Sequence, residues 1–511
     1  MQIRLASNSL DTLAPDLLVV PVFGEPAKDA AFKALDKARN GELSDVAARE
    51  GFVGKAGQTL TITGNGKGPG RTLLIGLGEK RGFKIAGLRD VAARASRLGR
   101  LKGAKTVAVV LPAQGAKSVE RAIELTAEGA HLGVYKFDKY YGDSRKKPSR
   151  IEEFDYAFAK AGKITAAQKR KFGAAVKRGV AIAESVCYAR DFINEPADFM
   201  TPSQMAAEAR KIAKKNAGLS VKVLSAKECE KLGMGMFLAV GRGSDEESKL
   251  IHITYKPKRA AKKRVYLIGK GVTFDSGGYS LKPSASMEDM KIDMSGAAAV
   301  IGAMNAIAQI GSDYEVHAIA ACCENLVNGR AYKLGDVLQA SDGTTVEINN
   351  TDAEGRLTLG DAITYARADI DKADKKNGTK KTPVEMFDFA TLTGACMVAL
   401  GNHTAGVMSH HEKLVRGWLG AADRAGEDMW RLPLTDKLKD QLKSNIADMR
   451  NTGERWGGAI TAGLFLKHFA KTTPWVHVDI AGPASSSREA GAIPKGGTGF
   501  AVATIVEYLT R

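Results

Sequence analysis

Two polar, glycine-containing stretches hold the residues best suited to chemistry. The first is GKGVTFDSGG at residues 269–278, and the second is NTDAEGRL at residues 350–357. Carboxylates that pack together without cations repel one another and shift toward protonation. Divalent metals remove this repulsion, and oxygen ligands suit Mg²⁺, Mn²⁺ or Zn²⁺. The candidate metal ligands in and near the two stretches are Lys270, Asp275, Asp293, Asp352 and Glu354.

These residues predict a site with two metals. Two ions about 3.5–4 Å apart, bridged by carboxylates, together activate a water and polarise a carbonyl group. Asp352 and Glu354 would point the same way if their segment is extended. The first stretch follows an apolar strand, and ligand sites of open α/β sheets lie beyond the carboxyl ends of strands. Each motif alone is weak evidence for a metal site, because a single Asp-x-Glu usually lies in a solvated loop. The prediction therefore rests on the two stretches taken together.

The sequence lacks the motifs that mark several other kinds of catalytic site. None of the eight histidines belongs to an HExxH motif, no GxSxG marks a serine nucleophile, and no GK[ST] completes a phosphate-binding loop. The pair His410–His411 is adjacent rather than spaced for one helix face, which favours surface or core roles.

The elements that position these residues follow an α/β rhythm. Apolar strands alternate with segments of helical spacing, which is typical of sheets covered by helices. The predicted strands are Leu17–Val22, Thr72–Ile75, Thr106–Leu111, Val265–Ile268, Val316–Ala321, Met386–Phe389 and Trp475–Ile480. The predicted helices include Ala86–Leu101, residues 164–192, Ala297–Ile310 and Thr358–Ala368, and residues 139–150 and 369–383 are predicted to be loops.

The sequence therefore predicts two α/β domains. We expect a basic N-terminal domain at residues 1–163, a linking helix at 164–192 and a catalytic domain at 193–511. The catalytic domain is expected to be a largely parallel sheet that is covered by helices and carries the site. Thr201 and Pro202 suit the cap and first turn of a helix.

Charge is spread unevenly over the 511 residues. The net charge is +18, and residues 1–170 hold 30 Lys and Arg against 18 Asp and Glu. A solvated basic surface is the simpler interpretation, and an anionic partner such as DNA is the alternative. The five cysteines lie in apolar or helical runs without a CxxC motif, which favours buried free thiols in a reducing compartment. No stretch approaches the roughly 20 apolar residues of a spanning helix, and a cytoplasmic location is expected.

At these motifs the chain resembles the leucine aminopeptidase, or cytosol aminopeptidase, family of metallopeptidases. The stretch at 350–357 matches the family signature, and the stretch at 269–278 matches with Lys282, Met290 and Asp293 at the family's spacing. ATLTGA at 390–395 and DIAG at 479–482 resemble the family as well. The resemblance covers roughly residues 185–511, with a looser match in the N-terminal domain.

The resemblance implies a role for each residue. The tighter metal would be held by Lys270, Asp275, Asp293 and Glu354, and the second by Asp275, Asp352 and Glu354. Lys282 would stabilise the developing oxyanion, and Arg356 would anchor a bicarbonate that acts as general base. The pocket for the first side chain of the substrate would contain Met290, Thr391, Gly394 and Ala481.

The resemblance also implies an activity and an assembly. We expect a homohexamer that uses Mn²⁺ or Zn²⁺ and releases leucine and other apolar residues from peptides with a free N-terminus. Some bacterial members also bind DNA through the N-terminal domain, which keeps that alternative open here. A carboxypeptidase or amidase on the same scaffold is a third alternative, and free and N-acetylated peptides would separate it from an aminopeptidase.

Overall fold

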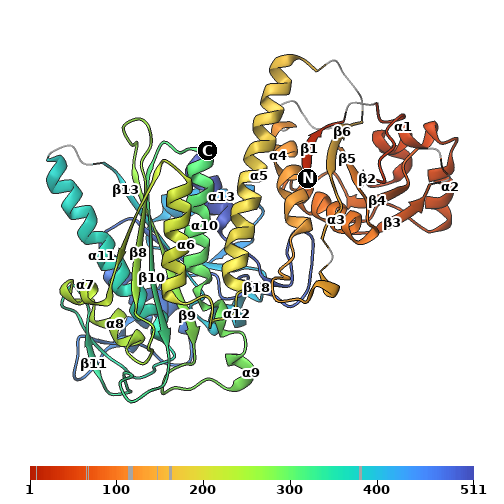
Figure 1. Ribbon diagram of the computed structural model, residues 1–511. Coiled ribbons are helices and arrows are strands. Elements are labelled where there is room, and N and C mark those ends of the chain that lie inside the picture. Colours follow the sequence, from red (N-terminus) through yellow and green to blue (C-terminus); the bar gives the residue numbers. More distant parts are fainter. Residues whose placement is uncertain are drawn as a thin grey trace. The chain divides into compact units, whose positions relative to one another are not determined.

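The computed structural model describes residues 1–6, 9–64, 66, 68–112, 119–146, 148–159, 164–378 and 382–511. The chain forms two compact units, and Figure 1 labels their elements. The N-terminal unit comprises Met1–Glu184 and Glu489–Pro494, and the C-terminal unit comprises Ser185–Arg488 and Lys495–Arg511. Among the described residues, no helix has both the length and the apolar character that crossing a membrane requires.

The N-terminal unit is built on a six-stranded sheet in the order β1-β6-β5-β2-β4-β3, in which only the β3–β4 pair is antiparallel. Its strands are β1 (Gln2–Leu5), β2 (Leu17–Phe23), β3 (Thr59–Thr63), β4 (Arg71–Gly78), β5 (Thr106–Leu111) and β6 (Glu153–Phe158). Its helices are α1 (Ala30–Ala38), α2 (Glu42–Arg49), α3 (Gly87–Lys102), α4 (Val119–Val134) and the first part of α5 (Ala166–Asn194), with short 3₁₀ turns at Pro26–Lys28 and Asp143–Arg145.

Strand β2 shows why strands of this sheet appear in the sequence as continuous apolar runs. Leu18 and Val20 pack with Phe32 of α1 on one face, whereas Leu17 and Val19 pack with α3 on the other. A strand that is buried on both faces needs apolar residues at consecutive positions rather than at alternate ones. This explains why the pattern identified the strand.

The C-terminal unit is built on an eight-stranded sheet in the order β15-β14-β17-β13-β9-β10-β8-β7. The central strands β17, β13, β9 and β10 are parallel to one another. The strands are β7 (Leu219–Leu224), β8 (Lys249–Tyr255), β9 (Arg264–Asp275), β10 (Glu315–Asn325), β13 (Val384–Ala390), β14 (Ala405–Met408), β15 (Met429–Arg431) and β17 (Trp475–Asp479). Small sheets add β11 (Val337–Gln339), β12 (Thr345–Glu347), β16 (Met449–Arg450), β18 (Ser485–Ser486) and β19 (Gly496–Gly497).

Helices cover both faces of the central strand β9. The helices of the unit are α6 (Pro202–Lys215), α7 (Ala226–Lys231), α8 (Gly235–Gly241), α9 (Ser284–Met287), η4 (Met290–Met294), α10 (Ser295–Ile310), α11 (Glu354–Asn377), α12 (Gly394–Leu400), α13 (Glu412–Ala425), η5 (Asp436–Leu442), α14 (Gly458–Ala470) and α15 (Val502–Thr510). On one face, α10 approaches so closely that a Cβ atom on Gly269 of β9 would lie 2.5 Å from the carbonyl oxygen of Gly296. On the other face, Tyr266 and Ile268 pack in the core that α11 and α14 share.

The α/β fold class predicted from the sequence is confirmed, and several element bounds differ from the predicted ones. Strand β9 continues to Asp275, well beyond the predicted end at Ile268. Helix α11 begins at Glu354 and continues to Asn377, so residues 369–377 are helical and the predicted loop there is wrong. Residues 379–381 of that segment, and Lys147 of the other predicted loop, lie outside the described residues. Thr201 caps α6 as predicted, because its side chain accepts a hydrogen bond from the backbone N–H of Gln204.

Candidate active site

Lys270 lies inside β9, and its side chain points toward the start of α11. Its Nζ lies 2.6 Å from Oδ1 of Asp293 and 2.7 Å from Oε1 of Glu354. It also donates a hydrogen bond of 3.1 Å to the carbonyl oxygen of Thr391. A Cβ atom at position 355 would lie 2.5 Å from Cε of Lys270, so Gly355 leaves the space that the lysine chain occupies.

Three buried carboxylates converge around this lysine from three different elements. Asp275 ends β9, Asp293 lies in η4, and Glu354 is the first residue of α11. One carboxylate oxygen from each of the three lies within 4.8 Å of the others. Asp352 borders the group with a side chain that is 33% exposed. The segment from Asp352 to Glu354 enters a helix and is not extended, so the condition under which the two side chains would point the same way is not met.

The electrostatics of the group call for a cation. Burial raises the pKa of Asp275, of Asp293 and of Asp352, because charged carboxylates lose their hydration. Burial by itself lowers the pKa of Lys270, but Asp293 and Glu354 outweigh burial and raise it. Oδ2 of Asp293 and Oε2 of Glu354 are buried without a hydrogen-bond partner among the described residues. Such unsatisfied oxygens are costly unless they bind a positive ion. The donor set therefore fits divalent metal ions.

Several residues outside the predicted ligand set orient the ligands, and the sequence analysis assigned none of them this role. Asn325, at the end of β10, donates a hydrogen bond of 2.8 Å from Nδ2 to Oδ1 of Asp275. Thr391 donates a hydrogen bond of 2.8 Å from Oγ1 to Oδ1 of Asp293. Asp479 accepts hydrogen bonds from the backbone N–H of Leu392 and from Oγ1 of Thr393, which fixes the loop that carries Thr391. Asp275 and Asn325 end the adjacent parallel strands β9 and β10. Because ligand sites lie beyond the carboxyl ends of such strands, the sequence could have indicated Asn325 as well.

Two further cations lie beside the ligands. Lys282 forms ion pairs with Asp352 and, at 2.9 Å, with Oδ2 of Asp275. Burial opposes its charge, but Asp275 and Glu354 outweigh burial and raise the pKa of Lys282. Arg356 donates a hydrogen bond from Nη1 to the carbonyl oxygen of Asn451 at 2.7 Å, and its Nε is buried without a partner. Burial lowers the pKa of Arg356 to about 10, so the guanidinium stays charged at neutral pH.

One cavity of about 880 Å³ contains every residue that the sequence analysis assigned to the site. The predicted metal ligands lie in its wall together with the two cations. The four predicted pocket residues are in the same wall, and they are Met290, Thr391, Gly394 and Ala481. The structure thus brings together all eleven predicted site residues, although they come from segments up to about 200 positions apart.

Comparison with known proteins identifies the family. Residues 187–506 match the catalytic domain of the cytosol aminopeptidase family, and residues 19–144 match its N-terminal domain. The chain is 41% identical to a probable cytosol aminopeptidase of Gloeobacter violaceus over 97% of this chain and 96% of the relative. It is 38% identical to a probable cytosol aminopeptidase of Alkaliphilus metalliredigens over 99% of both chains.

Solved structures agree with this match. A mutant of tomato leucine aminopeptidase superposes with a TM-score of 0.87 at 34% identity, over 100% of this chain and 96% of the other. The bottromycin maturation enzyme BotP, in complex with Mn, superposes with a TM-score of 0.81 at 35% identity, over 97% of this chain and 99% of the other. The cavity, its buried carboxylates and these matches lead to one conclusion: the chain belongs to the cytosol aminopeptidase family and is a metal-dependent aminopeptidase.

Proposed function

We propose that this aminopeptidase uses two metal ions to release leucine and other apolar residues from peptides with a free N-terminus. The observation that carries the proposal is the cluster of Asp275, Asp293 and Glu354 around Lys270, with carboxylate oxygens that lack partners. In this proposal Lys270, Asp275, Asp293 and Glu354 hold one ion, and Asp275, Asp352 and Glu354 hold the other. The donor set accepts Mn²⁺ or Zn²⁺. When bound, the ions supply an activated water and polarise the scissile carbonyl group.

Lysine 270 must be neutral to bind a cation. The carboxylates around Lys270 keep it protonated while no ion is bound, because they raise its pKa. Lys270 would therefore have to release a proton from Nζ to hold an ion, and metal affinity should increase with pH.

Lys282 and Arg356 act on the substrate in this proposal. Lys282 retains its proton, since Asp275 and Glu354 raise its pKa, and its charge stabilises the oxygen of the carbonyl group under attack. Arg356 offers an unpartnered buried Nε in the cavity wall, which fits a planar anion such as bicarbonate. A bicarbonate held there would accept the proton of the attacking water.

Leucine preference is supported by the wall of the cavity. Met290 and Ala481 add apolar surface, and Gly394 leaves room for a branched side chain. One structural relative is itself a leucine aminopeptidase. Exposed Trp430, Ile446 and Trp456 are apolar surface that a homohexamer would cover, and we extend the proposal to that assembly. The names of the relatives support a cytoplasmic location. They give no support to the DNA-binding alternative.

The decisive experiment replaces the first residue of α11. Glu354→Ala should abolish hydrolysis of a leucyl anilide while circular dichroism shows an intact fold. Full activity in that variant would refute the proposed site. Free and N-acetylated leucyl peptides, compared on the wild-type enzyme, test the requirement for a free amine. Equal cleavage of both would contradict exopeptidase action at the N-terminus.

A further inference from the structure

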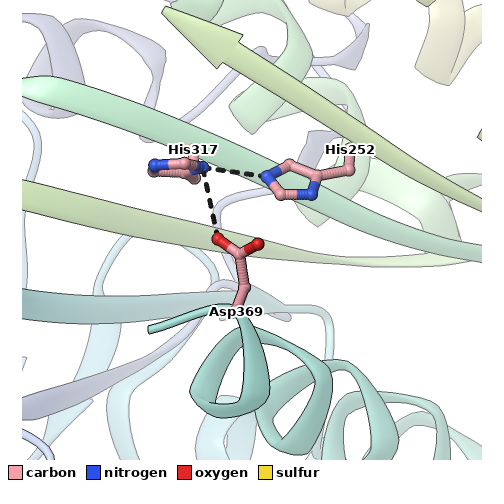
Figure 2. A group of neighbouring side chains, drawn as sticks. All are labelled: His252, His317 and Asp369. Atoms are coloured by element: carbon pink, nitrogen blue, oxygen red, sulfur yellow. Dashed lines mark hydrogen bonds and ion pairs between the residues drawn. The ribbon is translucent and has the colours of Figure 1, made fainter. Parts of the chain in front are cut away.

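A second group of potential ligands lies in the C-terminal unit, away from the active site. His252 comes from β8, His317 from β10 and Asp369 from the middle of α11. We call these three residues the imidazole cluster. Figure 2 shows the two rings and the carboxylate turned toward one another. Nε2 of His252 lies 2.9 Å from Nδ1 of His317, which in turn lies 3.9 Å from Oδ2 of Asp369.

The imidazole cluster lies near the amino ends of the parallel strands, whereas the active site lies near their carboxyl ends. Tyr266, which stacks on His317, precedes Lys270 by four residues in β9. At about 3.3 Å per residue, the two positions are separated by roughly 13 Å along the strand. The imidazole cluster therefore shares no residue with the proposed catalytic ligands.

The separations between these atoms suit one small metal ion. Bonds of about 2.0–2.1 Å in a tetrahedral site place neighbouring ligand atoms roughly 3.3 Å apart. The separations of 2.9 and 3.9 Å bracket that value. Oγ1 of Thr254, 3.4 Å from Nδ1 of His317, or a water would supply a fourth ligand.

Each of the three side chains makes a further contact outside the cluster, through the second ring nitrogen of each histidine and through Oδ2 itself of Asp369. Nδ1 of His252 is hydrogen-bonded to the hydroxyl of Tyr365 at 3.1 Å. Nε2 of His317 lies 3.4 Å from Oε1 of Glu315, and Asp369 accepts a hydrogen bond of 2.8 Å from the hydroxyl of Tyr266. Such outer contacts are typical of metal-binding histidines, because they set the ring orientation and the tautomer.

Protonation in this group is compatible with ion binding. The carboxylate of Glu315, 3.4 Å from Nε2 of His317, favours the tautomer with the proton on that nitrogen, which leaves Nδ1 to accept. In that tautomer His252 donates from Nε2 to Nδ1 of His317. The hydroxyl of Tyr365 can donate or accept, so His252 can move its proton to Nδ1 and free Nε2. An ion would thus replace one hydrogen bond and leave every outer contact in place.

Charge and access also favour a cation. Asp369 and Glu315 are two carboxylates beside two imidazoles, with Oε1 of Glu315 at 3.4 Å from Nε2 of His317. Arg264, the nearby guanidinium, is already paired with Asp374. The two histidines are 8% and 6% exposed, whereas the side chain of Asp369 is 32% exposed and opens a route from solvent.

We propose that His252, His317 and Asp369 bind one divalent transition-metal ion such as Zn²⁺, in a site separate from the active site. Imidazole nitrogens and one carboxylate suit Zn²⁺ and its neighbours better than Mg²⁺. The ion would join β8, β10 and α11. This inference is independent of the proposed catalytic mechanism, since its tests measure the position and amount of metal and not hydrolysis.

Anomalous diffraction tests the position directly. Crystals of the full chain, grown with micromolar Zn²⁺, should give a peak at the zinc edge within bonding distance of His252 Nε2 and His317 Nδ1. The absence of a peak there, in crystals whose active site does bind zinc, would overturn the proposal. A peak that appears only at millimolar zinc would indicate an adventitious ion and would overturn it as well.

Metal content tests the same site in solution. After equilibration with micromolar Zn²⁺ and gel filtration, Asp369→Asn should contain one equivalent of zinc fewer than the wild type. Asp371→Asn is the matched control, because Asp371 is an exposed acid on the same helix. Glu354→Ala should retain the equivalent that Asp369→Asn loses. Equal zinc content in the wild type and in Asp369→Asn would refute the proposal.

Discussion

The active-site carboxylates and the imidazole cluster share helix α11 and differ in whether their polar atoms already have partners. α11 supplies Glu354 to the first group and Asp369 to the second. In the first group, buried carboxylate oxygens lack partners. In the second, the two rings are hydrogen-bonded to each other and to Tyr365. An ion is thus required by the first group and is accommodated by the second.

The comparison predicts the largest loss of hydrolysis at Asp293. Asp293→Asn keeps the shape of the side chain but removes a charge that Lys270 and Thr391 contact. Hydrolysis of a leucyl anilide should fall by about 10³-fold or more, as for residues that act as one unit. Asp369→Asn, the same change in the imidazole cluster, should leave hydrolysis near the wild-type rate. Similar losses in both variants would show that the two groups are not functionally distinct.

A smaller effect is expected at Lys282, which contacts two ligands but is not proposed to be one. Lys282→Met should lower kcat by about 10²–10³-fold, the range for loss of an oxyanion-stabilising group. Its metal content should match that of the wild type, as elemental analysis would show. Loss of metal together with activity would make Lys282 part of the metal-binding group instead.

Asn325 should affect metal affinity rather than the chemical step. It is fully buried and donates from Nδ2 to Asp275 at 2.8 Å and to the carbonyl oxygen of Thr351 at 3.0 Å. Asn325→Ala should weaken metal binding by about 10–100-fold, the range for outer contacts of ligands. Hydrolysis should recover as metal is added in a titration. A variant that binds metal normally and stays slow would contradict this positioning role.

His252 should have the smallest effect on hydrolysis and a measurable effect on stability. Burial and the neighbouring His317 lower the pKa of His252 to about 4. Between pH 6.5 and 5 the unfolded chain therefore binds more protons than the folded one, and stability falls as pH falls. The loss from this residue is about 2 kcal/mol over that interval.

Urea unfolding of the metal-free enzyme at the two pH values measures this effect. His252→Gln should have a shallower pH dependence than the wild type by about that amount, with an unchanged rate of leucyl anilide hydrolysis at neutral pH. The same pH dependence in the variant would mean that His252 is protonated in the folded state.

Local patterns identified the elements that are buried on both faces. β2 and β5 match their predicted spans closely, because consecutive apolar residues leave few alternatives. The metal ligands were predicted from the joint motif, the other site residues from the family resemblance, and the structure brings them into one cavity. The spacing of Asp352 and Glu354 left their backbone conformation open, and Glu354 starts a helix, which no spacing of two residues reveals.

Local sequence patterns could not predict which residues from distant parts of the chain come together. His252, His317 and Asp369 lie 52 to 117 positions apart and belong to no motif, so only the pairing of β8 with β10 brings the two rings together. The segment from residue 369 was predicted to be a loop because it is rich in lysine and aspartate. α11 extends into it because charged residues are tolerated on the solvent side of a helix whose opposite side is packed.

The alternation of side chains along β9 has a consequence for how this protein can vary. Tyr266 and Lys270 point to the same face only because an even number of positions separates them. Insertion or deletion of one residue between them would turn one of the two to the opposite face of the sheet. Homologues and engineered libraries must therefore keep the length of this interval, and also Gly269 within it, because a Cβ atom there would lie 2.5 Å from the carbonyl oxygen of Gly296. A change in that length would disrupt either the active-site carboxylates or the imidazole cluster.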